Sequence, residues 1–339
     1  MPLPPLFGHE GLKNRLAGAI ASGRLPQALL LEGPRGVGKQ RLGLWLAQRL
    51  VCREPRAIEP CGRCQDCRLV LSLSHPDVHW FVPIEASKKG GDADKQVELA
   101  AEALGEEMAA RRDEPLYAPP TGLAGHGIAS VRLLLKQLAL TPALASRKVF
   151  IIGDAERLVS QTGAEAAANA LLKALEEPPA DTVFVLTAAE PEALLPTILS
   201  RVVRVHLARL ADTVVTAFAQ QVLGLAAKEQ IAQRVAAAEG CIGRLLATRD
   251  DAAATGAAQA GRLLEDGYGF ALSQMPFQAR GGFTDMLDAL AGRLRAEVKS
   301  GGESRKLVEA IARVMDARDM AQGNVNPQLL AAVLAQDLS

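Results

Sequence analysis

Four of the five cysteines lie within residues 52–67 in the pattern C-x8-C-x2-C-x2-C, and they are Cys52, Cys61, Cys64 and Cys67. Four thiolates suit a tetrahedral Zn²⁺ ion, and the two-residue spacings let neighbouring sulfurs turn toward one ion. Because four protein ligands leave no open coordination position, we predict a structural rather than a catalytic zinc site. A redox pair of Cys61 and Cys64, or free thiols, is the alternative. The fifth, Cys241, is predicted to be an ordinary small helix residue.

Charged and polar residues surround these cysteines. Zinc bound by four thiolates carries a net negative charge, which flanking arginines could offset; these are Arg53, Arg56, Arg63 and Arg68. His75 and Asp77 follow in a His-Pro-Asp sequence. We predict turn and packing roles for them, with extra metal ligation as the alternative.

A phosphate-binding loop is indicated by residues 33–40, Gly-Pro-Arg-Gly-Val-Gly-Lys-Gln, which match G-x-x-x-x-G-K. Gly33, Gly36 and Gly38 let backbone N–H groups turn toward phosphate oxygens, and Lys39 adds a mobile positive charge. The match lies between a predicted strand and a predicted helix, as such a loop requires. Gln40 stands where Ser or Thr normally holds Mg²⁺, so the sequence leaves open whether ATP or ADP binds.

The second strand of this fold should end in the carboxylates that hold Mg²⁺ and activate water. Asp154 has the expected position of the metal-ligating Asp, and Ala155 stands where a catalytic Glu is usual. Glu156 follows one residue later, and at a strand end this shift is predicted to turn its side chain away from the site. Hydrolysis needs all of these groups in place, so the pattern argues against a self-sufficient ATPase.

The elements that must position these residues alternate between strands and helices up to residue 207. Apolar runs predict buried strands at 27–32, 148–152, 182–187 and 202–205, and helical spacing predicts helices at 39–51, 129–140 and 164–177. This alternation indicates an α/β domain with a parallel sheet covered on both faces.

Other segments interrupt or follow this alternation. A cysteine-rich loop is predicted at 52–67, and a surface excursion at 85–126, helical near 96–111 and otherwise a mobile, solvated loop. Beyond residue 207 the chain reads as helices, broken at Glu239-Gly240, Gly267-Tyr268-Gly269, Gly281-Gly282 and Gly301-Gly302. Helical domains therefore follow the α/β domain.

The composition limits membrane and nucleic-acid functions. Lysine plus arginine and aspartate plus glutamate each number 38 in 339 residues, so a zero net charge gives no global reason to bind nucleic acid. The chain has no uninterrupted apolar run of about eighteen residues, and its first ten residues lack a basic region followed by an apolar one. We therefore expect a cytoplasmic protein without a membrane partner, in a compartment where disulfides are rare.

Several motifs, taken in order, resemble one known family. They are GRLPQALL at 23–30, the phosphate loop, the four cysteines, HPD at 75–77, NALLKALEEPP at 169–179, EPEALLPTI at 190–198 and SR at 200–201. They resemble the clamp-loader subunits of bacterial DNA polymerase III, which are AAA+ proteins. The altered catalytic motifs resemble delta prime more than its ATPase relative gamma/tau. The resemblance covers residues 1–245, and NVNPQLL at 324–330 resembles the final helix of the family's collar.

This resemblance implies a fold class and partners. An AAA+ phosphate-loop domain with a parallel sheet would span 1–207, including the zinc module at 52–67 and the excursion at 85–126. A small helical lid domain would span 208–250, and an all-helical collar domain 251–339. Delta prime sits with gamma/tau and delta subunits in a hetero-pentameric ring that loads the sliding clamp on primed DNA. The resemblance thus implies a rigid stator without ATP hydrolysis of its own.

The resemblance also implies roles for single residues. Arg201 would be an arginine finger at the neighbouring subunit's ATP site, an effect worth ~10³–10⁵ in rate. Thr187, at the end of the third strand, would be a first sensor of nucleotide, with an ordinary strand-end residue as the alternative. Two residues depart from the family pattern: Val202 replaces the usual cysteine, and Arg244 stands one position late for the lid's sensor arginine.

Two other functions compete with the non-hydrolysing subunit. The first is an active clamp-loader ATPase like gamma/tau, in which Glu156 or Gln40 compensates for the altered motifs. The second is a zinc-based nucleic-acid-binding module. The neutral charge and the scarcity of aromatic residues near the cysteines count against this second function.

Overall fold

The computed structural model describes residues 3–85, 91–115, 124–158, 165–247, 251–272, 280–299, 304–321 and 326–338. The chain folds into two compact units, of which the first ends at Leu246 and the second begins at Ala247. Within the described ranges, no helix is long and apolar enough to cross a membrane. The Gly301-Gly302 break and residues 324–325 of the predicted collar motif lie outside these ranges.

A parallel five-stranded sheet forms the centre of the first unit, in the order β2-β3-β4-β1-β5. Its strands are β1 Ala28–Glu32, β2 Val78–Phe81, β3 Lys148–Ile152, β4 Thr182–Ala188 and β5 Val203–His206. Four of them correspond to predicted strands, and β2 at the sheet edge is an addition. The phosphate loop follows β1, which lies between β4 and β5, and the sheet confirms the predicted α/β class.

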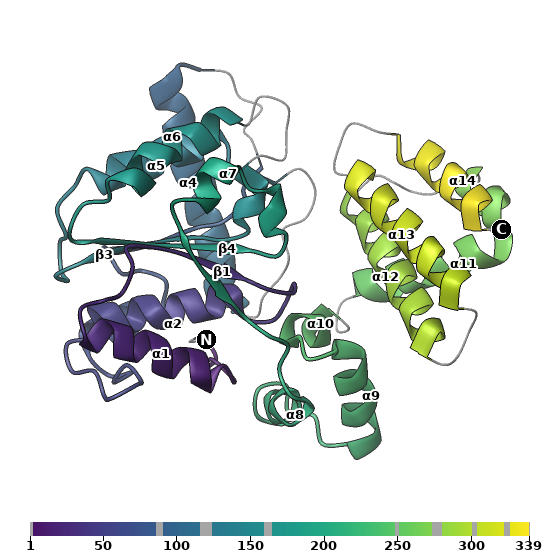
Figure 1. Cartoon of the computed structure of the whole chain (residues 1–339), viewed down its shortest axis with the longest axis horizontal. Helices are drawn as coiled ribbons and strands as arrows, with labels where there is room; N and C mark the ends of the chain where they lie inside the picture. The colour runs from purple at the N-terminus through teal and green to yellow at the C-terminus, as the bar shows by residue number, and fades with distance from the viewer. Residues whose placement is uncertain are drawn as a thin grey trace. The chain divides into compact units, whose positions relative to one another are not determined.

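Helices cover both faces of this sheet (Figure 1). α1 Glu10–Ala21 and α2 Lys39–Val51 lie on one face, and α5 Ile128–Leu138, α6 Glu165–Glu176 and α7 Pro196–Leu199 lie on the other. Successive residues of β1 alternate between the faces, with Leu29 and Leu31 in the core under α2 and Leu30 in the opposite core. Because both faces are covered, the central strands read as continuous apolar runs.

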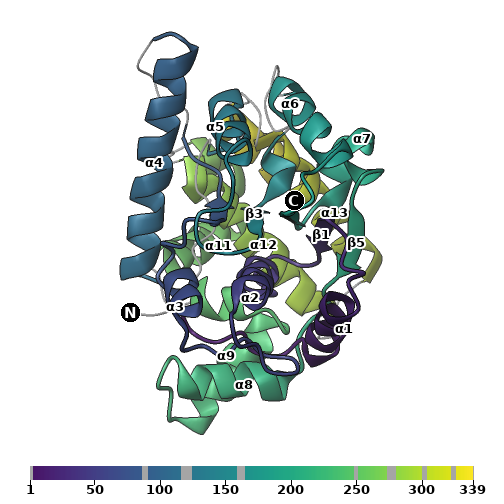
Figure 2. The same cartoon turned by 90° about the vertical axis from the view of Figure 1, so that its left-hand side faces the viewer.

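The described part of the predicted excursion contains the helix that was predicted near 96–111, and contacts with the rest of the unit anchor it. α4 Ala93–Asp113 is longer than the predicted 96–111, packs against α5, and stands beside it in Figure 2. Its two flanks meet where Ile84 and Gly125 exchange backbone hydrogen bonds of 3.1 and 2.9 Å. Near the C-terminal end of α4, the Arg111 guanidinium lies 4.8 Å from the ring centre of Trp80 on β2. Residues 86–90 and 116–123 of the predicted excursion lie outside the described ranges.

Three short helices complete the first unit: α8 Asp212–Gln221, α9 Lys228–Ala238 and α10 Ile242–Ala247. They share a small apolar core of their own, which includes Val215, Phe218 and Leu245. The predicted break at Glu239-Gly240 is present, with φ of 47° and 73°, both in the left-handed region. These helices occupy the sequence range predicted for the lid.

The second unit is all-helical in its described residues. It contains α11 Asp251–Leu272, α12 Arg280–Lys299, α13 Ser304–Ala321 and α14 Pro327–Leu338 around one apolar core. Gly267 interrupts the helical backbone of α11 with φ of 51°, as predicted. Gly281 and Gly282, where a break was predicted, lie in the first turn of α12, which begins at Arg280.

Candidate functional site

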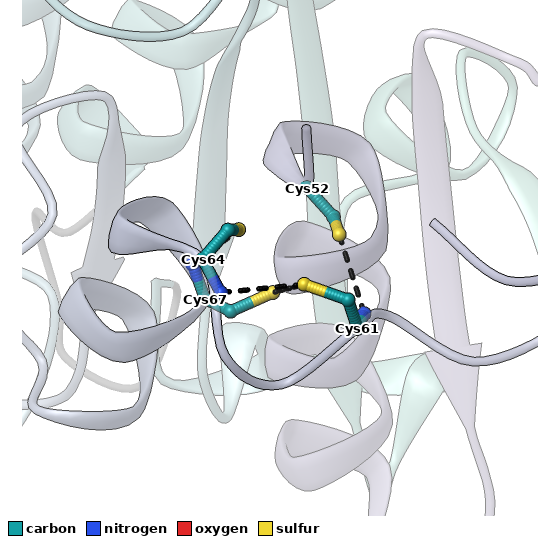
Figure 3. A group of neighbouring side chains, drawn as sticks. All are labelled: Cys52, Cys61, Cys64 and Cys67. Carbon is teal, nitrogen blue, oxygen red and sulfur yellow. Dashed lines mark hydrogen bonds between the residues drawn. The ribbon is translucent and has the colours of Figure 1, made fainter. Parts of the chain in front are cut away.

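The four cysteines come together at the far end of α2 from the phosphate loop (Figure 3). Cys52 is the C-cap of α2, and Cys61 comes from the loop that follows. Cys64 is the N-cap of α3 Gln65–Leu71, and Cys67 lies in its first turn. The predicted loop at 52–67 therefore ends at Cys64, where α3 begins.

Their sulfur atoms have the spacing of a metal-binding set. All four lie within 4.8 Å of one another, and the Cys61 and Cys67 sulfurs are 3.9 Å apart. A tetrahedron with Zn–S bonds of about 2.3 Å has edges of about 3.8 Å. The backbone N–H groups of Cys61, Cys64 and Cys67 donate to the sulfurs of Cys52, Cys61 and Cys64 at 3.3–3.4 Å. This set could hold a metal ion with four sulfur ligands.

Burial and backbone N–H groups are the main causes of the pKa shifts of these cysteines. N–H groups of Arg63 and Cys64 lower the pKa of Cys61 to about 6, which favours its thiolate. Burial raises the pKa of Cys52 and that of Cys67 in the absence of a cation. The Arg53 side chain pairs with Asp66 instead of a sulfur, at 2.5 Å. Arg63 likewise pairs with Glu54, at 3.5 Å.

A buried hydrogen-bonded chain joins the cysteine module (residues 52–67) to the edge of the sheet. Asp66, 1% exposed, accepts from Arg53 and lies 3.3 Å from His75 Nε2. His75 Nδ1 accepts from the backbone N–H of Asp77 at 3.0 Å. The Asp77 carboxylate accepts from the backbone N–H groups of residues 143–145 at 2.6–2.7 Å. His75 and Asp77 thus have the predicted packing roles.

The phosphate loop has the backbone that its glycines predict. Gly33, Gly36 and Gly38 have φ of 148°, 77° and 109°, which favour glycine. Gly33 must also be glycine for space, because a Cβ there would lie 2.4 Å from the carbonyl oxygen of Leu207. Lys39 Nζ donates to the carbonyl oxygens of Gly33 and Pro34 at 2.8 and 2.9 Å. Burial lowers the pKa of this lysine.

Three of the predicted nucleotide-site residues meet at the carboxyl edge of the sheet. Gln40 Nε2 donates to Asp154 Oδ2 at 2.9 Å, and the Asp154 backbone N–H donates to Thr187 Oγ1 at 3.0 Å. Asp154 has φ of 49°, a left-handed conformation tolerated by Asp. Gln40 Oε1 is buried without a partner in the described part of the chain. The Gln40–Asp154 contact, between residues 114 positions apart, was not predicted.

The Glu156 side chain is buried just after the end of β3. β3 ends at Ile152, and a 3-10 turn, η1 Ala155–Leu158, brings Glu156 to a position only 9% exposed. Its Oε1 accepts from the backbone N–H of Ala189 at 3.1 Å. Burial, followed by the charge of Asp154, raises its pKa, and Lys39 interacts with it electrostatically. The charges of both carboxylates raise the pKa of Lys39, which partly opposes the effect of burial.

A cavity of about 120 Å³ opens beside the loop. Its lining includes Lys39, Gln40 and Asp154, and apolar side chains from the N-terminal segment and the lid helices, among them Phe7 and Phe218. Trp80 and Arg111 also line it, and the sequence analysis did not assign them to this site. Trp80 lies on β2, a strand that the sequence pattern did not predict.

One lid helix touches the phosphate loop directly. The backbone N–H of Gly243 donates to the Gly36 carbonyl oxygen at 2.8 Å, and a Cβ on Gly243 would lie 2.5 Å from Gly36 Cα. The neighbouring Arg244 guanidinium pairs with Glu239 at 2.5 Å. Arg244 thus has a partner within the lid, consistent with its displaced position in the motif.

Arg201 follows the C-cap of α7, Ser200. Its Nη1 donates to the Thr197 carbonyl oxygen at 2.7 Å and to Ser200 Oγ at 3.1 Å. Its Nη2 pairs with Glu176, the last residue of α6. The Arg201 side chain is 30% exposed, and Val202 beside it is buried as a packing residue. Arg201 is therefore a partly exposed arginine held in a defined geometry.

Comparisons with known proteins agree with the motifs. The sequence model of the family described as DNA polymerase III, delta subunit, matches residues 8–211. The DNA polymerase III subunit delta′ of Pseudomonas aeruginosa is 35% identical over 177 residues, 52% of this chain and 42% of that protein. The delta′ subunit of Escherichia coli is 32% identical over 188 residues, 56% and 44% of the two chains. A gamma/tau subunit of Mycobacterium tuberculosis is 32% identical over 197 residues, 58% and 27% of the two chains.

The solved structure of a DNA polymerase III gamma subunit-related protein from Thermotoga maritima is 17% identical and has a TM-score of 0.47, covering 97% of this chain and 99% of that one. The match to the delta′ subunits spans less than half of their length. The family match covers more than half of this chain, and it includes the four cysteines, the phosphate loop and Arg201. This chain therefore belongs to the DNA polymerase III delta subunit family.

Proposed function

We propose that this protein is a delta′-type clamp-loader subunit that organises the loader ring without hydrolysing ATP itself. The observation that carries this proposal is the family match over residues 8–211. Relatives named delta′ and gamma/tau are subunits of DNA polymerase III, which supports assembly with other loader subunits. We propose a hetero-pentameric ring with gamma/tau and delta, which acts on the sliding clamp and primed DNA in the cytoplasm.

The phosphate-loop geometry supports the lack of hydrolysis. The Gln40 amide stands in place of the hydroxyl that would hold Mg²⁺, and it bonds the carboxylate of Asp154. Ala155 provides no carboxylate at the usual position of the catalytic base. Lys39 is bonded to carbonyl oxygens of its own loop. These residues can form the loop's shape without providing the groups that activate water.

Arg201 is the residue we propose for chemistry, in the ATP site of an adjacent subunit. A guanidinium can stabilise charge on the γ-phosphate only when the neighbouring subunit docks correctly. Arg201 is partly exposed, and its contacts with Thr197 and Ser200 fix its direction. Its ion pair with Glu176 must open or be shared when a phosphate approaches. The finger therefore begins from a held conformation.

For the cysteine module we propose a structural Zn²⁺. The sulfur spacing and the N–H···S bonds fit four thiolates around one ion, and no water-binding position is left. The module then joins the loop after α2 to the start of α3 and, through Asp66 and His75, to the sheet edge. Its proposed role is mechanical.

The test of the finger compares two arginines in the assembled loader. Arg201→Ala should leave the ring intact and lower its DNA-stimulated ATPase by a factor of about 10³ if one site dominates turnover, less if sites act in parallel. Arg204→Ala is the matched control, since Arg204 is an exposed arginine on β5 paired with Glu32. Unchanged ATPase in an intact Arg201→Ala ring would refute the finger.

An active ATPase remains the second candidate function, because Glu156 lies buried near Lys39 and Asp154. The isolated chain decides between them. The proposed function expects negligible turnover of ATP. Turnover of several per second that disappears in Lys39→Ala would establish an active ATPase instead.

A further inference from the structure

The Mg²⁺ position of the phosphate loop is the strongest feature that the proposed function leaves unexplained. In phosphate loops of this type, a hydroxyl after the lysine and an acidic residue on a neighbouring strand face one Mg²⁺ ion. Gln40 and Asp154 stand at those two positions. Their side chains contact each other directly, with Gln40 Nε2 2.9 Å from Asp154 Oδ2.

The residues do not fit a magnesium ion. Mg²⁺ needs oxygen ligands at about 2.0–2.1 Å in near-octahedral geometry. The group facing Asp154 is an N–H donor, which cannot ligate a cation. Gln40 Oε1 is buried without a partner among the described residues, and Nε2 is the Gln40 atom that is directed at the Asp154 carboxylate.

The end of β3 is shaped to receive the glutamine. A Cβ on Gly153 would lie 2.9 Å from Gln40 Cδ and Nε2, closer than real side chains approach. Gly153 does not have a positive φ, so its conformation would allow any residue and only space requires glycine. His126 Nε2 lies 2.7 Å from the Gly153 carbonyl oxygen, which fixes the backbone beneath the amide. Gln40 and Gly153 thus form a matched pair.

We infer that the Gln40–Asp154 hydrogen bond replaces the magnesium ion, so that this loop meets nucleotide phosphate through Lys39 and backbone N–H groups without a metal. The inference rests on the non-hydrolysing phosphate loop of the proposed function. On this inference, the Gln40 side chain alone prevents Mg²⁺ from binding. Returning a hydroxyl to position 40 frees Asp154 and reopens the metal position.

The test is a titration of the isolated full chain with a fluorescent ADP analogue, in Mg²⁺ and in EDTA. The affinity of the wild-type chain should change by no more than about twofold between the two conditions. Gln40→Thr should bind at least about tenfold more tightly in Mg²⁺ than in EDTA, as metal-assisted phosphate binding requires. A wild-type affinity that Mg²⁺ raises tenfold, or a folded Gln40→Thr chain that Mg²⁺ leaves unchanged, would overturn the inference.

A second measurement checks the geometry without any nucleotide. Gly153→Ala should lower the thermal unfolding midpoint by about 5 °C in the wild-type chain, because its methyl group collides with the Gln40 amide. In a Gln40→Ala background the same change should cost less than half of that shift. Equal shifts in both backgrounds would show that the amide does not occupy this space. Both measurements use the isolated chain, so they can fail independently of the Arg201 experiment in the assembled loader.

Discussion

The cysteine module and the phosphate loop lie at opposite ends of one helix, α2, and they differ in how much of their chemistry is intact. At the C-terminal end, all four thiols converge within bonding range of a single ion. At the N-terminal end, Gly38 and Lys39 keep the shape of a phosphate site, but protein atoms bond the lysine and the acidic residue. One end has four thiols that could hold an ion, and at the other end we propose that a hydrogen bond replaces one.

This difference shows what each site depends on. The thiols come from a short segment and need little besides one another and the turns between them. The nucleotide site at the phosphate loop also needs residues that follow β3 and lie on β4, and a substitution at any of them can alter the site. Loss of function at the second site therefore needs no loss of fold, whereas a change at the first should cost stability.

Removal of one thiolate should give the largest effect. Cys67→Ser should abolish binding of one zinc per chain and cost on the order of 5 kcal/mol of unfolding free energy, part of the roughly 10–16 kcal/mol that zinc provides in zinc-finger peptides. Elemental analysis and thermal unfolding measure the two effects. Cys241→Ala is the control, since Cys241 is buried elsewhere and should keep the zinc. A metal-free wild-type chain with reduced cysteines would contradict the comparison.

A medium effect should follow when the module is detached from the sheet edge. Asp66→Asn weakens the contacts with Arg53 and His75 and should cost about 2 kcal/mol while zinc stays bound. Glu54→Gln breaks only the 3.5 Å pair with Arg63, in which both side chains are mostly exposed, and should cost less than about 0.5 kcal/mol. Denaturant unfolding compares the two variants. Equal costs would mean that the buried chain adds nothing to the zinc.

The smallest effect should come from the phosphate loop, and it should be a gain. Burial raises the pKa of Glu156 in the folded state above its ordinary 4.5, so protonated Glu156 favours the folded state. This contribution to the unfolding free energy is fully present below pH 4.5 and is lost as the pH rises through the folded-state pKa. Glu156→Gln keeps the acceptor for Ala189 and should therefore stabilise the chain by about 1 kcal/mol at pH 7. The gain should vanish near pH 4 in unfolding measurements. A loss at pH 7 would mean that the charged carboxylate is needed there.

Local patterns were enough to predict much of this molecule from its sequence. The cysteine spacing, the glycine-lysine loop and the apolar runs of β1, β3 and β4 each act over a few residues. β2 was missed because it is a half-buried edge strand with polar His79 in its centre, which breaks the apolar run. The helix of the excursion was predicted, but its anchoring was not, because it depends on contacts with residues distant in the sequence, such as that of Arg111 with Trp80.

Features that depend on pairs of distant residues were beyond the sequence patterns. Glu156 is buried and accepts a hydrogen bond from the backbone N–H of Ala189, 33 positions away in the sequence, and no local pattern indicated this contact. The sequence showed only that Gln40 lacks the hydroxyl usual at this position. The structure adds that its side chain forms a hydrogen bond with Asp154, 114 positions away. The roles of Arg201 and of the zinc ligands remain predictions that the experiments above test.

The sheet order also determines when during synthesis β1 can pair with its neighbouring strands. β1 is hydrogen-bonded on both sides to strands made much later, since β5 ends at His206, 174 residues after Glu32 (206 − 32). At roughly 5–20 residues per second, a ribosome takes about 9–35 s to cover that distance. Residues 52–67 leave the ribosome early in this interval. The proposed zinc site can therefore form while β1, the strand that precedes the phosphate loop, still lacks its neighbours β4 and β5.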